Sequence, residues 1–234
     1  LDVLDRYLQR GRGLFVCLDP MRAPALGERL AAYGVALRGD VVVDPTARLY
    51  GGEDLTLKAE LDRGGHPLVL AMGAAPLFSR TRTVEVVPGA SGVTLLWSSR
   101  ESWASSELGA AVSGHARFDP LRDRRGPLSL GIEAFTRFPG PEGDAERVAH
   151  VLAFGNAAFV SNGFLDYLGN RDLLTNGISW LARDREGIGA HKARRTPGVQ
   201  QFYLSDEDGA GVVWLTAVLQ PAVLLLIGLA ITAR

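Results

Sequence analysis

Cysteine is almost absent from this sequence, and histidine is scarce. The single cysteine, Cys17, excludes an internal disulfide framework and a metal site built from several cysteines. The four histidines, at positions 66, 115, 150 and 191, are scattered and lack the H-x-x-x-H or similar spacing of metal ligands. We therefore expect neither a metal site nor a cofactor.

An excess of charge of either sign is also missing. Lys and Arg together number 25, Asp and Glu number 26, and the net charge is −1. No basic block alternates with aromatic residues, so the sequence does not favour nucleic-acid binding. With 47% hydrophobic and 22% charged residues, the composition is that of a folded chain rather than a disordered one.

Motifs that expose a nucleophile are missing as well. No serine lies in a G-x-S-x-G elbow, and Cys17 lies within the apolar stretch LFVCLD, where a buried thiol is inert. Gly155 does not begin a G-x-G-x-x-G dinucleotide fingerprint. We therefore assign no catalytic residue and expect a protein that is not an enzyme. A Ser–His–Asp arrangement stays open, because spacing alone does not test it.

The strongest pattern that is present is an apolar run at positions 212–232, 21 residues without a charged side chain. A helix needs roughly 20 apolar residues to cross a bilayer core, so the run predicts a transmembrane helix; the alternative is a buried helix of a soluble domain. Acidic residues precede the run and Arg234 follows it, which predicts a cytoplasmic C-terminus and an extracytoplasmic position for residues 1–210. Gln220 and Pro221 interrupt the run, and we expect this polar break to contact a partner helix.

The rest of the chain predicts an α/β fold. Helical spacing at the N-terminus and at 25–35 alternates with short apolar strands at 13–20 and 41–43, which favours a mostly parallel sheet. The middle is predicted to be rich in strands, and the clearest later helix covers 168–184. The further predicted strands are 66–71, 83–87, 93–97, 127–138 and 148–155.

These elements predict three parts: an α/β domain over 1–184, a polar linker over 185–211, and the membrane helix over 212–232. Because Leu1 opens the chain inside a helical pattern, we also expect an N-terminal part of the domain to precede it.

Two places where a strand runs into a turn are candidate sites, since ligands of α/β folds bind at the carboxyl ends of strands. Asp19 follows the first strand. The second place, between Phe154 and Leu174, is rich in short polar side chains. These can shape the turn and cap the next helix, with Asn170 or Asp172 as the cap, or they can form a ligand site. The candidates at this second place are Asn156, Ser161, Asn162, Asn170 and Asp172.

The order of several motifs resembles one protein family. G-x-L-F-V-x-L-D-P (13–20) is followed by L-x-x-Y-G-V and V-V-V-D-P within 30–45. Later come F-G-N-x-x-F-x-S-N (154–162) and G-N-R-D-L-L-x-N-x-I-x-W-L (169–181), and a terminal run with a central Gln-Pro closes the chain. Nearly the whole chain resembles the GldG-like auxiliary proteins of ABC transporters, a group associated with gliding motility. Where many relatives have an aspartate in the turn, this chain has Asn156.

The resemblance implies a Rossmann-like domain related to class I glutamine amidotransferases, with a β-rich middle and the terminal membrane helix. It further implies a non-enzymatic accessory subunit in the bacterial inner membrane, whose extracytoplasmic domain couples to the permease and contacts a substrate or an envelope component. The partners expected from it are an ABC permease and ATPase, membrane lipid and further copies of the chain. The alternatives are a surface-tethered amidotransferase or hydrolase-like enzyme and a receptor for a small molecule.

Overall fold

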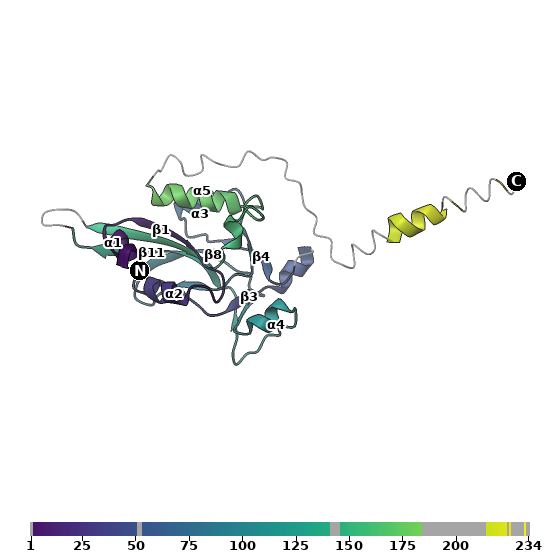
Figure 1. The fold of residues 1–234 in the computed structure, drawn as a ribbon, viewed down its shortest axis with the longest axis horizontal. Helices are drawn as coiled ribbons and strands as arrows, with labels where there is room; N and C mark the ends of the chain where they lie inside the picture. Colours follow the sequence, from purple (N-terminus) through teal and green to yellow (C-terminus); the bar gives the residue numbers. More distant parts are fainter. Residues whose placement is uncertain are drawn as a thin grey trace.

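The computed structural model describes residues 2–50, 53–140, 146–183, 214–223, 225 and 232. Within these ranges, five strands form a large sheet and the other strands form three small antiparallel sheets (Figure 1). In spatial order, the large sheet contains β1 (Gly13–Cys17), β12 (Arg147–Phe154), β11 (Ser129–Phe138), β8 (Ser91–Trp97) and β5 (Glu60–Leu61).

The small sheets and the helices surround this large sheet. The small sheets are β10 (Arg124–Arg125) with β9 (Trp103–Ser105) and β3 (Val41–Val43), β2 (Val35–Leu37) with β7 (Val84–Val86), and β4 (Thr56–Lys58) with β6 (Leu77–Ser79). The α-helices are α1 (Asp2–Gln9), α2 (Pro24–Ala31), α3 (Pro67–Leu70), α4 (Leu108–Val112) and α5 (Asn170–Leu181). The other helical turns are the 3₁₀-helices η1 (Pro45–Tyr50) and η2 (Ala158–Val160) and the π-helix η3 (Trp214–Leu219).

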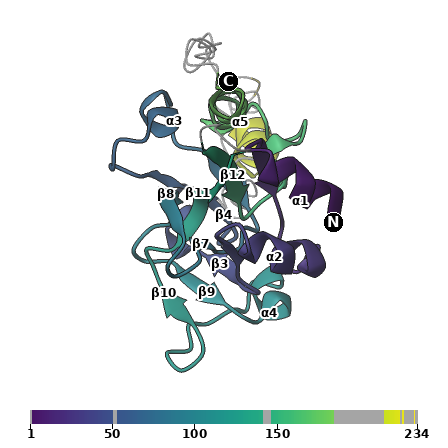
Figure 2. The ribbon, with the colours of Figure 1, turned by 90° about the vertical axis from the view of Figure 1, so that its left-hand side faces the viewer.

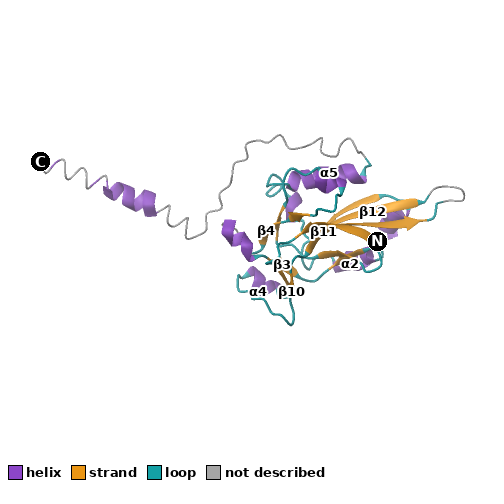
Figure 3. Ribbon diagram, turned by 180° about the vertical axis from the view of Figure 1, so that it is seen from behind, coloured by secondary structure: helices purple, strands orange, loops and turns teal. Residues whose placement is uncertain are grey.

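The large sheet is mixed, which corrects the predicted fold class. β1 runs parallel to β12, whereas the pairs β12–β11, β11–β8 and β8–β5 are antiparallel. Figure 3 shows β11 and β12 as the long strands of the sheet, consecutive in the chain. The strand after α2, β2, pairs with β7 outside this sheet. The Rossmann-like, amidotransferase-like prediction is therefore wrong, because the first strand–helix–strand unit does not return to the sheet that contains β1.

Helices cover both faces of the large sheet (Figures 1 and 2). One core lies under α1 and α2, where Leu8 and Leu30 meet the strand residues Ile132 and Val151. A second core lies under α3 and α5 and includes Leu68, Leu173, Leu152, Phe154 and Phe159. Alternate residues of β12 enter opposite cores, as the two-residue period of a strand requires.

The local predictions met mixed outcomes. The strands predicted at 13–20, 41–43 and 148–155 and the helix predicted at 168–184 are confirmed as β1, β3, β12 and α5. The strand predicted at 66–71 is wrong, because this segment forms α3. Pro67 occupies the first turn of that helix, and the His66 side chain accepts a hydrogen bond from the Leu68 amide at 3.2 Å.

The predicted membrane helix at 212–232 is corrected too. Its described part includes η3 and the helical residues as far as Val223, ten residues from Trp214, which span roughly 15 Å, half of a bilayer core. Within the described parts of the chain, no helix has the length and apolar character to cross a membrane. The inner-membrane localisation and the orientation derived from this helix are therefore overturned. The whole of the predicted linker at 185–211, and positions 212–213, 224 and 226–231, lie outside the described residues.

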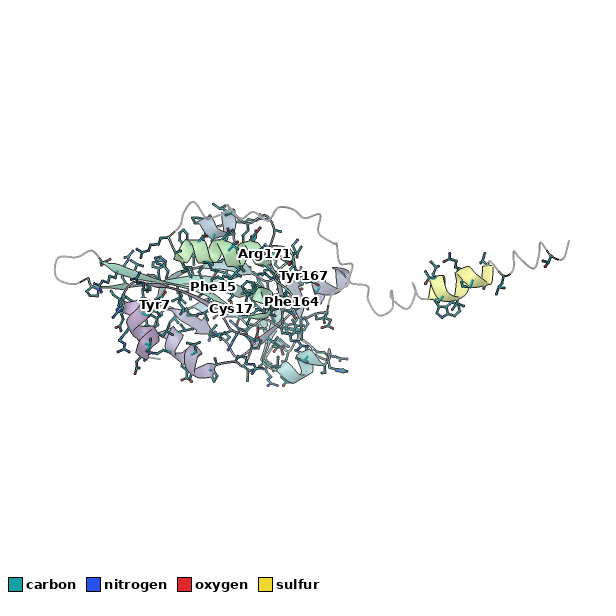
Figure 4. The ribbon with its side chains drawn as sticks, turned by 45° about the horizontal axis from the view of Figure 1, so that its top comes forward. Tyr7, Phe15, Cys17, Phe164, Tyr167 and Arg171 are labelled. Carbon is teal, nitrogen blue, oxygen red and sulfur yellow. The ribbon has the colours of Figure 1, made fainter. Side chains whose placement is uncertain are left out.

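Close packing holds α5 on the sheet. A Cβ atom at Gly177 would lie 2.5 Å from Cε2 of Phe15 and 3.4 Å from Cδ1 of Leu152. The Phe15 ring has little freedom to yield, because it lies 5.2 Å from the Phe154 ring and 6.5 Å from the Phe159 ring, centroid to centroid. Figure 4 shows Phe15 and Cys17 beside α5.

We expect Gly177→Ala to lower the free energy of unfolding by about 1–3 kcal/mol, the usual cost of overpacking a core. Gly109→Ala in α4 is the matched control, since a Cβ atom there meets nothing within 4 Å. Alanine favours a helix by up to about 1 kcal/mol over glycine, so the control is expected to keep or raise stability. Urea unfolding of both variants tests the pair; a Gly177→Ala chain as stable as the control would contradict the close packing.

Candidate functional site

A buried carboxylate lies in the middle of β11. Glu133 is 4% exposed and faces the layer of α3 and α5, while its neighbours Ile132 and Ala134 point into the opposite core. A buried charge is costly unless it is paired and hydrogen-bonded. The surroundings of Glu133 must therefore supply donors.

Three side chains supply them. His150 Nδ1 and Trp180 Nε1 lie 2.8 Å and 2.6 Å from Oε1, and His66 Nε2 lies 2.9 Å from Oε2. They come from β12, from α5 and from the N-cap of α3. Glu133 and its three donors are termed the Glu133 cluster, and the donors connect three separate segments to the central strand.

The hydrogen bonds of His66 define its tautomer. Its Nδ1 accepts from the Leu68 amide, so the proton is on Nε2 and is donated to Glu133. The Trp180 ring packs edge-on against the His66 imidazole, with 4.7 Å between the ring centroids. His66 thus starts α3 and holds Glu133 with one neutral ring.

The carboxylate of Glu133 is kept ionised. Burial acts to raise its pKa, but the hydrogen bonds from His150, His66 and Trp180 outweigh burial and lower the pKa from 4.5 to about 2. At neutral pH the cluster therefore holds a fixed negative charge rather than an exchangeable proton.

The residue types of the cluster suggest a metal site, but its geometry does not. His66 and His150 each direct a ring nitrogen at the carboxylate, so these nitrogens face Glu133 rather than a shared ion. No group of three or more His, Cys, Asp or Glu side chains among the described residues could hold a metal ion.

The structure brings the predicted candidates Asp19 and Asn156 together. Asp19 Oδ1 accepts from the Ala157 amide at 2.7 Å and lies 3.3 Å from Asn156 Nδ2. Asn156 is fully buried; it donates to the Ser79 carbonyl and accepts from the Phe159 amide at 3.0 Å. These bonds join the ends of β1, β6 and β12.

Asn170 and Asp172 bind another segment, 73–77. Asn170 Oδ1 accepts from the Leu77 amide at 2.8 Å, and Asp172 Oδ2 accepts from the Gly73 amide at 3.2 Å. The expectation that one of them caps α5 is wrong, because its N-cap is Gly169, without a side-chain cap.

The remaining candidates are exposed. Ser161 donates to the Ala158 carbonyl at 2.6 Å, and Asn162 lies beside it in the same turn. Gln220 and Pro221 directly follow η3 and are exposed, so their contact with a partner stays a prediction.

Cys17 is partly buried, and burial and nearby Asp19 raise the pKa of its thiol to about 12. A thiol in this state is a poor nucleophile at neutral pH, as the sequence led us to expect.

Sequence reasoning missed the Glu133 cluster. Its members lie 17, 47 and 67 positions from Glu133, and no motif joins them. One local pattern could have pointed to it: Glu133 is the only charged residue between Leu128 and Phe135, in the middle of a strand that was predicted correctly. A lone charge inside an apolar strand implies buried donors.

Comparison with known proteins gives a likeness of fold. No protein-family model matches the sequence, and no curated protein matches it. Among solved structures, the mmIFT52 N-terminal domain matches with a TM-score of 0.50 and 17% identity, over 77% of this chain and 69% of that one. This neighbour is an IFT52 domain and not an ABC transporter component, so it does not support the place in a periplasmic gliding-motility transporter that the resemblance implied.

We expect Asn170→Ala to destabilise the chain by about 1–3 kcal/mol. The change leaves the partly buried Leu77 amide without its partner and removes a second bond, from Asn170 Nδ2 to the Phe164 carbonyl at 2.8 Å. The exposed Asn162→Ala change is the control and is expected to stay within about 0.5 kcal/mol of the original chain. Thermal unfolding compares the two, and equal stabilities would contradict the bridging role of Asn170.

Glu133→Gln tests the cluster through its pH dependence. The lowered pKa of Glu133 stabilises the fold above its unfolded pKa near 4.5, and this stability is lost as the pH falls toward 2. The difference corresponds to about 3 kcal/mol. A glutamine also turns an N–H donor toward one of the ring donors.

We therefore expect Glu133→Gln to be less stable by about that amount at pH 7, and the gap to close between pH 4.5 and 2. Urea unfolding across this range measures it, with the exposed Glu101→Gln as control. A gap that does not change with pH would show that the loss arises from packing and not from the charge.

Proposed function

We propose that this chain is a non-enzymatic binding domain that serves a larger assembly as an accessory subunit. The observation that supports this proposal is the saturation of Glu133 by three donors. Among the described residues, the Glu133 cluster has the residue types best suited to catalysis, and its hydrogen bonds stabilise the fold instead.

The states of the acidic groups support this reading. A general acid or base works best with a pKa near the working pH, whereas the pKa of Glu133 is lowered to about 2. Asp19 Oδ1 accepts a hydrogen bond from the amide of Ala157. Cys17, with its pKa raised to about 12, is a thiol and not a thiolate at neutral pH.

His150 is the residue that an enzymatic alternative would use. Its Nδ1 donates to Glu133, which is how a carboxylate orients a catalytic histidine, and its side chain is 31% exposed. Such a base needs a nucleophile within hydrogen-bond reach. In the part of the chain that the structure describes, no hydroxyl or thiol is hydrogen-bonded to His150. Its ring also lies beside that of Phe135, with 6.3 Å between the ring centroids.

The partners implied by the sequence resemblance, an ABC permease and its ATPase, stay predictions. Their capture does not depend on a membrane helix in this chain, since an accessory domain can bind a permease from outside the bilayer. Affinity purification of the tagged chain from its native cells tests them directly.

We expect the captured partners to be the same for the original chain and for His150→Gln. This variant should lose about 1.5–3 kcal/mol of stability, the worth of a hydrogen bond to a charged group, so capture is measured well below its unfolding temperature. The exposed His115→Gln is the matched control. Hydrolysis of an ester or amide substrate by the purified chain, abolished in His150→Gln and kept in His115→Gln, would overturn the proposal.

A further inference from the structure

A cavity of about 540 Å³ opens where α1 and α5 end and β12 begins. Four arginines line it, together with Tyr7 and Glu146: Arg10, Arg12, Arg147 and Arg183. They come from three segments that are distant in sequence. Figure 1 shows the end of α5 and the start of β12 at the same end of the molecule as α1.

Backbone packing fixes the arrangement of these segments. β1 and β12 are parallel with Gly13 opposite His150, so the turn before β1 lies beside the start of β12. A Cβ atom at Gly11 would lie 3.1 Å from Cβ of Arg147, and one at Gly13 would lie 2.8 Å from Cβ of Leu181. The turn therefore contacts Arg147 directly, and the end of α5 contacts the start of β1.

Two hydrogen bonds to backbone carbonyls also join these segments. An Arg183 guanidinium nitrogen donates to the Gly11 carbonyl at 3.4 Å, and the Tyr7 hydroxyl donates to the Gly13 carbonyl at 3.1 Å. Figure 4 shows Tyr7 on α1, at the opposite end of the domain from Phe164, Tyr167 and Arg171. The cationic side chains thus line one opening, and backbone contacts hold the segments that carry them together.

The charges of the lining are unbalanced. Among the described residues, Glu146 is the one carboxylate of the lining, and Arg137, outside the cavity, lies 3.8 Å from it. None of the ion pairs found among the described residues involves the four arginines. Four positive charges and one negative charge give the described residues of the lining a net charge of +3.

Helix ends do not remove this excess. The C-termini of α1 and α5 contribute a partial charge of about −0.5 each, and Arg10 and Arg183 are placed to offset them. Arg12 and Arg147 precede and begin strands, so neither follows a helix end. About two positive charges therefore remain for a ligand.

We propose that this cavity binds a small anion that carries two or more phosphate groups. The planar guanidinium group matches the oxygen geometry of a phosphate through paired hydrogen bonds. The cavity volume lies within the roughly 300–1,000 Å³ of small-molecule sites, which is more room than a single phosphate fills. This site is separate from the Glu133 cluster and does not depend on the partner proposed above.

Isothermal titration with pyrophosphate at low salt tests the proposal on the whole chain. We expect one pyrophosphate to bind per chain, and Arg12→Gln and Arg147→Gln each to weaken binding about tenfold. Arg100→Gln, an exposed arginine outside the cavity, is the matched control and is expected to bind as the original chain does. Circular dichroism verifies that each variant is folded.

Two further probes separate the sources of negative charge. Inorganic phosphate and citrate are titrated in the same way, and both are expected to bind more weakly than pyrophosphate. Equal binding of inorganic phosphate would overturn the requirement for two phosphates, and equal binding of citrate would make the cavity a site for carboxylates such as an acidic peptide. Binding of pyrophosphate that survives the combined Arg12→Gln and Arg147→Gln changes would overturn the site itself.

Discussion

A carboxylate in the middle of a sheet is tolerated when donors surround it, and Glu133 takes its donors from three segments. Breaking such a buried set costs more than its formation contributes, because a charge without partners is left in the core. The layer of α3 and α5 is therefore held in one position relative to β11. His66 also fixes where α3 begins, because the ring that binds Glu133 accepts a hydrogen bond from the Leu68 amide in the first turn of α3.

The position of α5 is constrained by contacts of two kinds. Gly177 allows close approach to Phe15, and a helix rotated about its axis would place a bulkier residue there. The polar contacts add direction: Asn170 reaches Leu77, Asp172 reaches Gly73 and Trp180 reaches Glu133. A helix shifted by one residue would lose all three bonds at once. Polar groups in this interface thus select one packing arrangement, while the apolar core supplies most of the stabilisation.

Local periodicity predicted elements, and it failed where partners are distant in sequence. The spacing of Leu173, Leu174, Ile178 and Leu181 was enough to find α5, and the apolar run before Gly155 was enough to find β12. The spacing of apolar residues does not show in which direction a strand runs. The alternation of helices and strands therefore favoured a parallel sheet, whereas the observed sheet is mixed. Residues 66–71 show the limit most clearly: a short apolar run fits strand and helix alike, and the histidine cap decides for the helix.

The charged residues fall into two groups: those that have partners within the chain and those that line the arginine cavity. Asp19 and Glu133 accept hydrogen bonds from within the chain, and several arginines elsewhere are paired, as Arg29 is with Asp5 and Arg124 with Glu85. Groups satisfied in this way stabilise the fold and offer little binding energy to a ligand, because a ligand would first have to displace their partners. The arginine cavity differs, since four of its described lining residues are cations and one, Glu146, is a carboxylate. Their mutual repulsion is relieved when an anion enters. We therefore expect this chain to bind a ligand at the arginine cavity, where positive charge is unbalanced, and not at Glu133, whose carboxylate already has three donors.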